Sequence, residues 1–130
     1  MKKIFFTIIL CFFFHNISQA KWIYATTTAD TKTRHYVETS SIIKDGEVTY
    51  IWILSDYVKR GKYNEMSIKA YVPVKCKLKQ FQVLQLIYYS GNMGKGNLIE
   101  RIDNPPSNTK WIGASPGSAW AQIVEKACAK

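Results

Sequence analysis

Few side chains in this sequence have the types and spacing that enzyme chemistry requires. His35 is the only histidine beyond residue 20, and the polar residues that could formally complete a Ser-His-Asp triad with it are Ser40, Ser41, Asp30 and Asp56. No glycine-flanked nucleophile elbow surrounds a serine, so the pattern favours an exposed strand histidine over a catalytic base. One histidine and two paired cysteines also make a poor metal-ligand set. We therefore expect no enzyme activity, no catalytic residues, no metal site and no cofactor.

A glycine-rich segment is the next candidate for chemistry. Residues 91–96 hold three glycines and Lys95, and such a loop could wrap an anion with its backbone N–H groups. The segment lacks the spacing of a P-loop and precedes a predicted strand instead of a helix. A hairpin turn is therefore favoured over a ligand loop.

Basic side chains give the sharper binding signal. Two groups stand out, Lys59, Arg60 and Lys62 in one predicted turn, and Lys75, Lys77 and Lys79 at alternating positions. If the second segment is extended, its lysines line one face of a strand. They could block strand-to-strand aggregation, as edge lysines often do, or they could dock acidic protein segments or sulfated polysaccharide. Nearby tyrosines could add contact area or could belong to the core and rim of the sheet, namely Tyr57, Tyr63, Tyr71, Tyr88 and Tyr89.

The two cysteines at positions 76 and 128 acquire meaning from the first twenty residues. Lys2 and Lys3 form a basic start, residues 4–14 an apolar run, and residues 18–20 a small-x-small cleavage site. We read residues 1–20 as a cleaved signal peptide and residues 21–130 as a single domain. Cys11 has no lipoprotein signature around it and leaves with the signal. An exported chain with two remaining thiols is expected to form one disulfide, Cys76–Cys128.

Length and charge restrict the class of protein further. Without Lys2 and Lys3, the chain keeps 16 basic and 9 acidic side chains, a net charge of +7. This balance favours anionic partners, and export makes nucleic acid the least favoured of them. The apolar run is too short for a membrane helix, and no later stretch approaches the ~20 apolar residues that one needs. We expect no transmembrane segment.

The rest of the chain must position these residues, and its pattern predicts strands followed by one helix. Residues 36–38 and 48–57 read as arms of a hairpin around Asp45-Gly46, and residues 48–57, apolar on both faces, are expected to be central. Residues 66–72 alternate until Pro73 marks an edge, a bulge or a break. A change of parity places a turn within residues 75–80. Residues 81–89 then form a long strand and residues 97–102 a short final one.

The C-terminal segment changes to a helical period. Ser115 is the expected N-cap and Pro116 the first helical residue. Apolar side chains then recur at three- and four-residue spacing, at Trp120, Ile123, Val124, Ala127 and Cys128. A helix this short is marginal in water, so it should dock on the sheet, where a bridge from Cys128 to Cys76 would hold it.

Several short motifs, taken in order, resemble one bacterial family. They are Trp22-Ile23-Tyr24, Tyr36-Val37, Ser41-Ile42, Val48, residues 52–57, a serine-started strand ending at Cys76, Tyr88-Tyr89, Gly94-Lys95-Gly96, Trp111-Ile112, residues 115–118 and Cys128. Together they resemble the surface-adhesin protein E family over nearly all of residues 21–130. The resemblance implies an α+β fold, an antiparallel sheet of about six strands with one C-terminal helix packed on it and tethered by the disulfide. It also implies a Gram-negative envelope protein that binds host extracellular-matrix or plasma proteins.

Two functions remain open at this point. The first is a non-catalytic, adhesin-like envelope protein that binds host or envelope proteins through Lys59, Arg60, Lys62, Lys75, Lys77 and Lys79. The second is a periplasmic accessory protein that binds a small ligand or a partner between sheet and helix. It is considered because a plain cleavage site stands where the protein that gives the family its name has a lipid-anchor cysteine. Localisation is expected to be periplasmic or secreted, with or without association to the cell surface. An edge strand could also pair with a second copy to give a homodimer.

Overall fold

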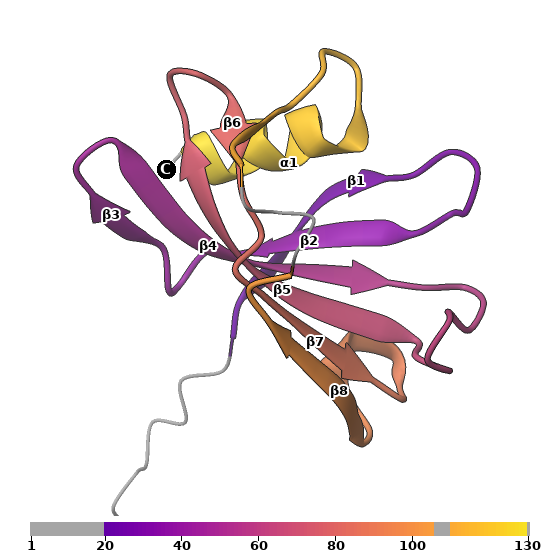
Figure 1. Cartoon of the computed structure of the whole chain (residues 1–130). Coiled ribbons are helices and arrows are strands. Elements are labelled where there is room, and N and C mark those ends of the chain that lie inside the picture. Colours follow the sequence, from indigo (N-terminus) through magenta and orange to yellow (C-terminus); the bar gives the residue numbers. More distant parts are fainter. Residues whose placement is uncertain (1–19, 106–109, 130) are drawn as a thin grey trace, which may run out of the picture.

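The strand-forming segments pair into one antiparallel sheet, with a helix at the C-terminal end (Figure 1). The computed structural model describes residues 20–105 and 110–129. The predicted signal peptide, with Cys11 and His15, therefore lies outside the described residues apart from Ala20. Within them, nine strands, a 3-10 turn and one α-helix follow in this order: β1 (Trp22–Thr27), β2 (Arg34–Glu38), β3 (Ile43–Asp45), β4 (Val48–Asp56), β5 (Ser67–Lys75), β6 (Gln80–Phe81), β7 (Gln85–Tyr89), η1 (Asn92–Gly94), β8 (Leu98–Asp103), β9 (Ile112–Gly113) and α1 (Ala119–Cys128).

β4 and β5 form the centre of the sheet and pair along their full lengths. β3 pairs with the first residues of β4 and β2 with its last, and β1 extends the sheet beyond β2. Across β5, the strands β7 and β8 follow its first half, whereas β6 and β9 follow its last residues. The central position of residues 48–57 and the tight turn at Gly46, whose φ is +59°, are confirmed.

The expected six strands prove too few for three reasons. The first arm of the predicted hairpin was expected at residues 36–38, but it is β3. Residues 36–38 belong to β2, which is a separate strand. The predicted strand over residues 81–89 is divided into β6 and β7, and β9 adds a strand after the predicted last one. The division lies opposite Pro73, whose carbonyl accepts a hydrogen bond from Gln82 N at 3.1 Å. Since proline has no N–H to return, regular pairing is interrupted there, although β5 itself continues through Pro73.

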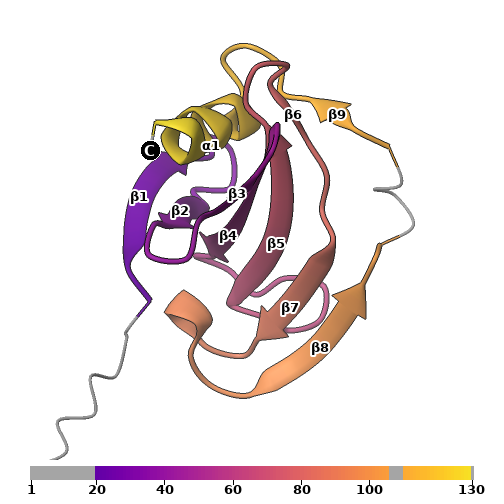
Figure 2. The same cartoon turned by 90° about the vertical axis from the view of Figure 1, so that its left-hand side faces the viewer.

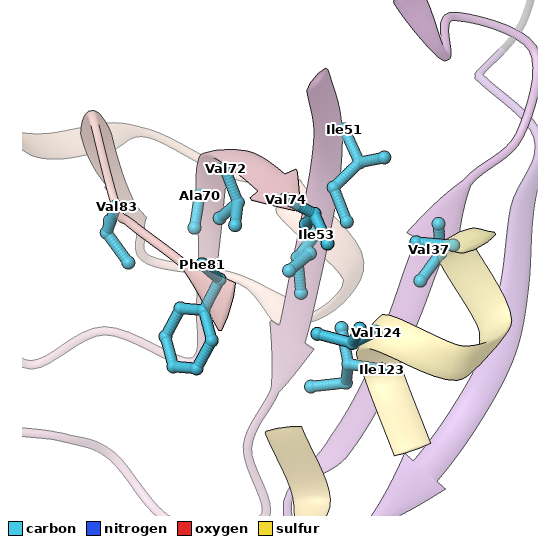
Figure 3. Packing of buried hydrophobic residues seen from close by; sticks show 11 residues of the cluster. Val37, Ile51, Ile53, Ala70, Val72, Val74, Phe81, Val83, Ile123 and Val124 are labelled. Atoms are coloured by element: carbon cyan, nitrogen blue, oxygen red, sulfur yellow. The ribbon is translucent and has the colours of Figure 1, made fainter. Parts of the chain in front are cut away.

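One face of the sheet carries the core, and α1 packs on the part of that face nearest β1 and β2, away from β7 and β8 (Figure 2). Val37, Ile51, Ile53, Val72 and Val74 are almost fully buried on that face. The helix contributes the buried Ile123, Val124 and Ala127 at the predicted spacing, and Figure 3 shows the two sets of side chains meeting. Burial of these side chains explains why so short a helix is stable here.

The helix begins three residues later than the sequence suggested. Ser118 is the N-cap, its hydroxyl accepting from Ala121 N at 3.1 Å, and Ala119 is the first helical residue. Gly117 has a φ of +79°, which is incompatible with a helix, so Pro116 cannot open one. The prediction of Ser115 as the cap was therefore wrong; its carbonyl instead accepts from Ser118 N.

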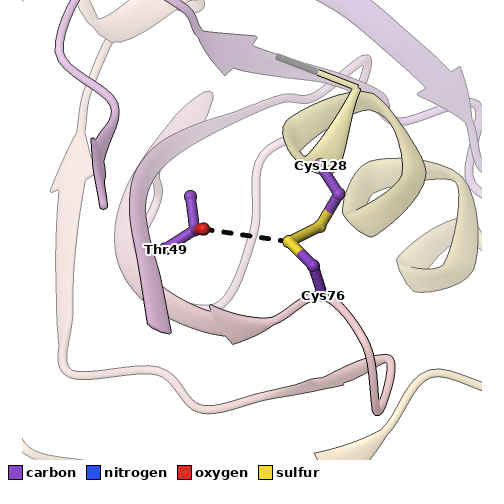
Figure 4. The surroundings of a disulfide bond; sticks show 3 residues. All are labelled: Thr49, Cys76 and Cys128. Carbon is purple, nitrogen blue, oxygen red and sulfur yellow. Dashed lines mark hydrogen bonds between the residues drawn. A yellow bond between two sulfur atoms is a disulfide. The ribbon is translucent and has the colours of Figure 1, made fainter. Parts of the chain in front are cut away.

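The predicted disulfide is present and joins the last turn of α1 to the end of β5 (Figure 4). Cys76 and Cys128 have their Cα atoms 5.8 Å apart. The Thr49 hydroxyl lies 3.8 Å from the Cys76 sulfur, toward which it can donate weakly. Cys76 opens the turn over residues 76–79, where the parity change predicted a reversal, and Lys79 has a φ of +52°. The bridge thus holds the helix over a bend in the sheet.

Candidate functional site

The face of the sheet opposite α1 is rich in aromatic side chains. Strand alternation and register place seven of them there: Trp22, Tyr24, Tyr36, Tyr50, Trp52, Tyr71 and Tyr89. All seven are at least partly exposed, and Tyr24 retains 51% of its accessible surface. We call this set the aromatic face. Exposed aromatic area of this kind on one face marks a candidate interaction surface.

The rings of the aromatic face contact one another across strands. Trp52 and Tyr71 lie on directly paired positions of β4 and β5, with ring centroids 4.9 Å apart. Tyr50 stacks on Tyr71 at 5.9 Å, and Lys69 Nζ lies 5.1 Å from the Tyr89 ring centroid. A hollow of about 330 Å³ opens beside Lys69 and Trp52. The face is therefore a preorganised surface of rings with a cation among them.

Glu38 anchors the margin of this hollow. It is only 4% exposed, and its carboxylate accepts from the backbone N–H groups of Lys21 and Ser40 and from the hydroxyls of Ser40 and Ser41. Burial alone would raise the Glu38 pKa, but these hydrogen bonds outweigh it and hold the pKa below its usual value. Ser40 and Ser41 thus serve Glu38 and do not contact His35, so the formal triad does not assemble from them.

His35 is half-buried, which corrects the expectation of an exposed strand histidine. Its Nδ1 lies 2.8 Å from the Ser55 hydroxyl and its Nε2 lies 2.8 Å from the Thr28 hydroxyl. Burial lowers the His35 pKa. Both ring nitrogens are thus matched by hydroxyls, and the neutral imidazole is favoured.

The six basic residues predicted to bind protein do not form one surface. Lys59, Arg60 and Lys62 lie in the connection between β4 and β5, whereas Lys77 and Lys79 lie in the turn at the far end of β5. The nine residues of β5 separate the two groups by roughly 26 Å, at ~3.3 Å per residue.

The condition under which Lys75, Lys77 and Lys79 would line one strand face is not met, because the turn predicted within residues 75–80 is present. Residues 76–79 form a turn, so only Lys75 is on a strand; its ammonium lies 4.2 Å from the Trp111 ring centroid.

Lys59, Arg60 and Lys62 border a groove of about 820 Å³ between this connection and the β1–β2 loop. Lys32 adds a fourth cation to its wall, and Asp30 and Glu65 add two anions. The exposed Val58 contributes an apolar patch with 61% of its surface accessible. We call this hollow the basic groove. Its net charge favours an anionic group.

The floor of the basic groove depends on a glycine. Glu65 is buried, accepts from Tyr63 N at 2.7 Å, and lies directly beneath Gly61. A Cβ at Gly61 would lie 2.0 Å from a Glu65 carboxylate oxygen, so a larger residue there would displace this buried carboxylate. The shape of the groove is thus set by the loop backbone.

The glycine-rich segment 91–96 forms the connection between β7 and β8 and contains η1. Its backbone and side chains bind groups of the sheet itself. Asn92 Nδ2 donates to Asp56 Oδ1 at 3.0 Å, Met93 N donates to the same oxygen at 2.8 Å, and Gly94 N donates to Ser67 Oγ at 2.9 Å. Asp56 also pairs with Arg34 at 3.3 Å. The segment is therefore the hairpin turn that the sequence favoured, and it also holds the buried carboxylate of Asp56.

Metal binding and membrane insertion were also checked for residues 20–105 and 110–129. Within these ranges no three His, Cys, Asp or Glu side chains are grouped so that they could hold a metal ion. No helix described there has the length and apolar character needed to cross a membrane.

Sequence reasoning missed the aromatic face as a surface. The signal was available, since tyrosine and tryptophan occupy alternate positions in β1 and β4, but alternation alone does not say which face a helix covers. The tyrosines singled out in the sequence divide between the two alternatives left open for them, contact surface and core or rim of the sheet. Tyr71 and Tyr89 belong to the face, whereas Tyr88 is buried on the opposite side and Tyr63 packs on it with centroids 4.9 Å apart.

A curved antiparallel sheet with one disulfide-tethered helix defines a class of small α+β domains, and comparison with known proteins identifies which one. The family model of surface-adhesin protein E matches residues 22–129, so this chain belongs to the surface-adhesin protein E family. Membership supports an adhesin-like, surface-associated protein. No curated protein matches the chain at a significant level of sequence similarity.

Solved structures of Haemophilus influenzae protein E share the fold. Crystal form II is 16% identical, with a TM-score of 0.60, over 85% of this chain and 89% of that one. The selenomethionine form is also 16% identical, with a TM-score of 0.61, over 85% and 88%. Protein E from the non-typeable bacterium is 12% identical, with a TM-score of 0.56, over 86% and 79%. At these identities the likeness establishes the architecture alone.

Proposed function

We propose that this chain is a non-catalytic, exported envelope protein of a Gram-negative bacterium that binds other proteins in the manner of an adhesin. Its partners are host extracellular-matrix or plasma proteins, or other proteins of the envelope. The aromatic face makes the contact. The two basic groups at the ends of β5, Lys59, Arg60 and Lys62 at one and Lys75, Lys77 and Lys79 at the other, add positive charge that draws acidic partners toward the domain. The observation that carries the proposal is the partly exposed aromatic face, which lies on the side of the sheet opposite α1.

The chemistry of the aromatic face suits a protein partner. Tyrosine and tryptophan carry much of the binding energy at protein interfaces, because they bury large rigid surfaces and keep one polar atom. The ring contacts of Trp52 and Tyr71 fix these side chains before binding, so little conformational entropy is lost. Basic groups of this kind accelerate encounter with acidic partners more than they strengthen the final complex.

Substitution on this face gives the direct test. Trp52→Ala and Tyr71→Ala should weaken binding to immobilised matrix or plasma proteins at least tenfold, since hot-spot residues contribute about 2 kcal/mol or more. Tyr63→Ala is the matched control, because Tyr63 is exposed but lies away from the aromatic face. Equal loss in all three variants, at unchanged melting temperature, would refute this assignment.

Charge and location are tested separately. Reversing Lys77 and Lys79 to glutamate should slow association and reduce its salt dependence, with little change in the dissociation rate. Intact cells should bind an antibody against the folded domain if the protein is displayed at the surface. Absence of that signal would exclude the adhesin role and leave binding to envelope proteins.

A second candidate function is a periplasmic accessory role, in which a small ligand binds between sheet and helix. A cavity of about 400 Å³ at this place favours it, because its volume falls in the range of ~300–1,000 Å³ found for small-molecule sites. Mass spectrometry of protein purified from the periplasm should then detect a copurifying small molecule. Repeatedly empty preparations would contradict this role.

A further inference from the structure

The cavity between the sheet and the first turn of α1 has a strongly apolar wall. It lies on the core side of the sheet, where the helix leaves the end near β7 uncovered. Its main apolar lining residues are Ile53, Ile68, Val83, Leu86, Trp120 and Ile123. Such a wall offers an apolar chain the same environment as the protein core.

One end of this cavity is polar and adjoins the basic groove. Thr28, His35 and Tyr57 line both hollows. The two ring nitrogens of His35 already lie 2.8 Å from the hydroxyls of Thr28 and Ser55. The Tyr57 hydroxyl makes no hydrogen bond within residues 20–105 and 110–129, so it remains available as a donor at the junction.

The two hollows differ in charge: the inner cavity is uncharged and the basic groove is positive. The inner cavity has no charged lining residue, whereas the basic groove has Lys32, Lys59, Arg60 and Lys62 against Asp30 and Glu65. Burial, reinforced by the Glu65 carboxylate and Tyr88, raises the pKa of Tyr57 to about 12, so its hydroxyl stays protonated at neutral pH. An apolar pocket, a neutral donor and a cationic rim therefore follow one another.

We propose that the cavity and the basic groove together bind a single-chain amphiphile with an anionic head group. The acyl chain lies beneath Trp120 and Ile123, and the head group accepts from the Tyr57 hydroxyl and faces Lys59 and Lys62. This assignment rests on the second candidate function and names its ligand class. It leaves the aromatic face, on the other side of the sheet, free for a protein partner.

The first test measures how affinity depends on the length of the acyl chain. The protein, exported by its own N-terminal segment and purified with its disulfide intact, is titrated calorimetrically with octanoate, decanoate and dodecanoate below their micellar concentrations. Affinity should rise about fourfold for each added methylene that the cavity buries. Dodecanoate should bind with one-to-one stoichiometry, and dodecyltrimethylammonium should bind much more weakly because its head group is cationic. Absence of saturable dodecanoate binding, or equal affinity for the cationic amphiphile, would overturn the proposal.

Paired variants separate the tail from the head. Ile68→Trp should fill the cavity and abolish the dependence on chain length, whereas Ile87→Trp, on the opposite face, should not. Lys59→Glu with Lys62→Glu should weaken dodecanoate binding at least threefold while leaving dodecanol binding unchanged. The control is Lys77→Glu with Lys79→Glu, remote from the groove. Unchanged dodecanoate binding in folded Ile68→Trp would overturn the assigned site.

The chain-length series uses the unmodified protein, so the proposal stays testable even if a variant fails to fold. A copurifying ligand of another chemical class would overturn the amphiphile and leave the periplasmic role standing. Protein that is empty from the periplasm and also fails to bind dodecanoate would remove both.

Discussion

Removal of the Cys76–Cys128 bridge should lower stability substantially without changing the native fold. The bridge joins residues separated by 52 positions. For a closed loop of that length, the chain-entropy relation gives roughly 14 cal/mol/K, or about 4 kcal/mol at 25 °C. This value is an upper expectation, because measured disulfides typically contribute ~2–4 kcal/mol. The perturbation is the double variant Cys76→Ala with Cys128→Ala, which leaves no unpaired thiol between residues 21 and 130.

The native state of this variant should still hold the helix on the sheet. Ile123, Val124 and Ala127 remain buried, and Trp120 remains stacked on Phe81, with ring centroids 3.8 Å apart. Tryptophan fluorescence before denaturation should therefore match that of the wild type. The structure thus argues against simple release of the helix when the bridge is removed.

Urea unfolding followed by circular dichroism measures the loss. With a slope of about 2 kcal/mol/M, a loss of 2–4 kcal/mol moves the midpoint down by roughly 1–2 M. Wild-type protein reduced with dithiothreitol should unfold at the same midpoint as the double variant, which controls for the alanine substitutions. A midpoint shift below about 0.3 M, or loss of the native fluorescence in buffer alone, would refute the reasoning.

Three local features can be tested in the same way, each with a matched control. Gly61→Ala should cost about 1–3 kcal/mol because the new methyl group displaces the buried carboxylate beneath the loop, whereas Gly113→Ala, with open space around it, should be close to neutral in thermal melts. Burial lowers the His35 pKa in the folded state, so the unfolded chain binds the proton more readily; stability should be retained above about pH 6.5 and fall as the pH drops below it. Urea midpoints measured against pH should show this slope in the wild type, and a persisting slope in His35→Gln would contradict it. Ser118→Ala should cost about 1 kcal/mol by removing the N-cap, and an equal loss in Ser115→Ala would refute the observed start of the helix.

Local signals in the sequence predicted much of the architecture. Gly46 marked the hairpin turn, the two apolar faces of residues 48–56 marked the central strand, and the parity change marked the reversal after Cys76. These features depend on neighbouring residues, so they can be read along the chain. The disulfide also followed from composition, because only two cysteines remained after the predicted signal peptide.

The errors arose where a pairing partner or a backbone conformation decides the outcome and the periodic pattern does not mark it. Residues 81–89 read as one strand, but Pro73 on the neighbouring strand interrupts their pairing. The helix start depended on Gly117 at positive φ, a conformation that its neighbours did not announce. Tertiary pairing overrides propensity in the first case, whereas in the second a local backbone conformation decides where the helix begins.

The two candidate sites, the aromatic face and the cavity beneath α1, could not be predicted from the sequence pattern, because both depend on which face of the sheet α1 covers. In β4, Trp52 and Ile53 are adjacent, yet one belongs to the aromatic face and the other lines the cavity beneath the helix. The helix lies on the Ile53 side because Ile123, Val124 and Ala127 are buried there, and the disulfide reinforces that placement. A substitution at Trp52 should therefore affect protein binding and leave amphiphile binding intact, whereas one at Ile68 should do the reverse. If instead both activities changed together in well-folded variants, the two faces of the sheet could not be independent sites.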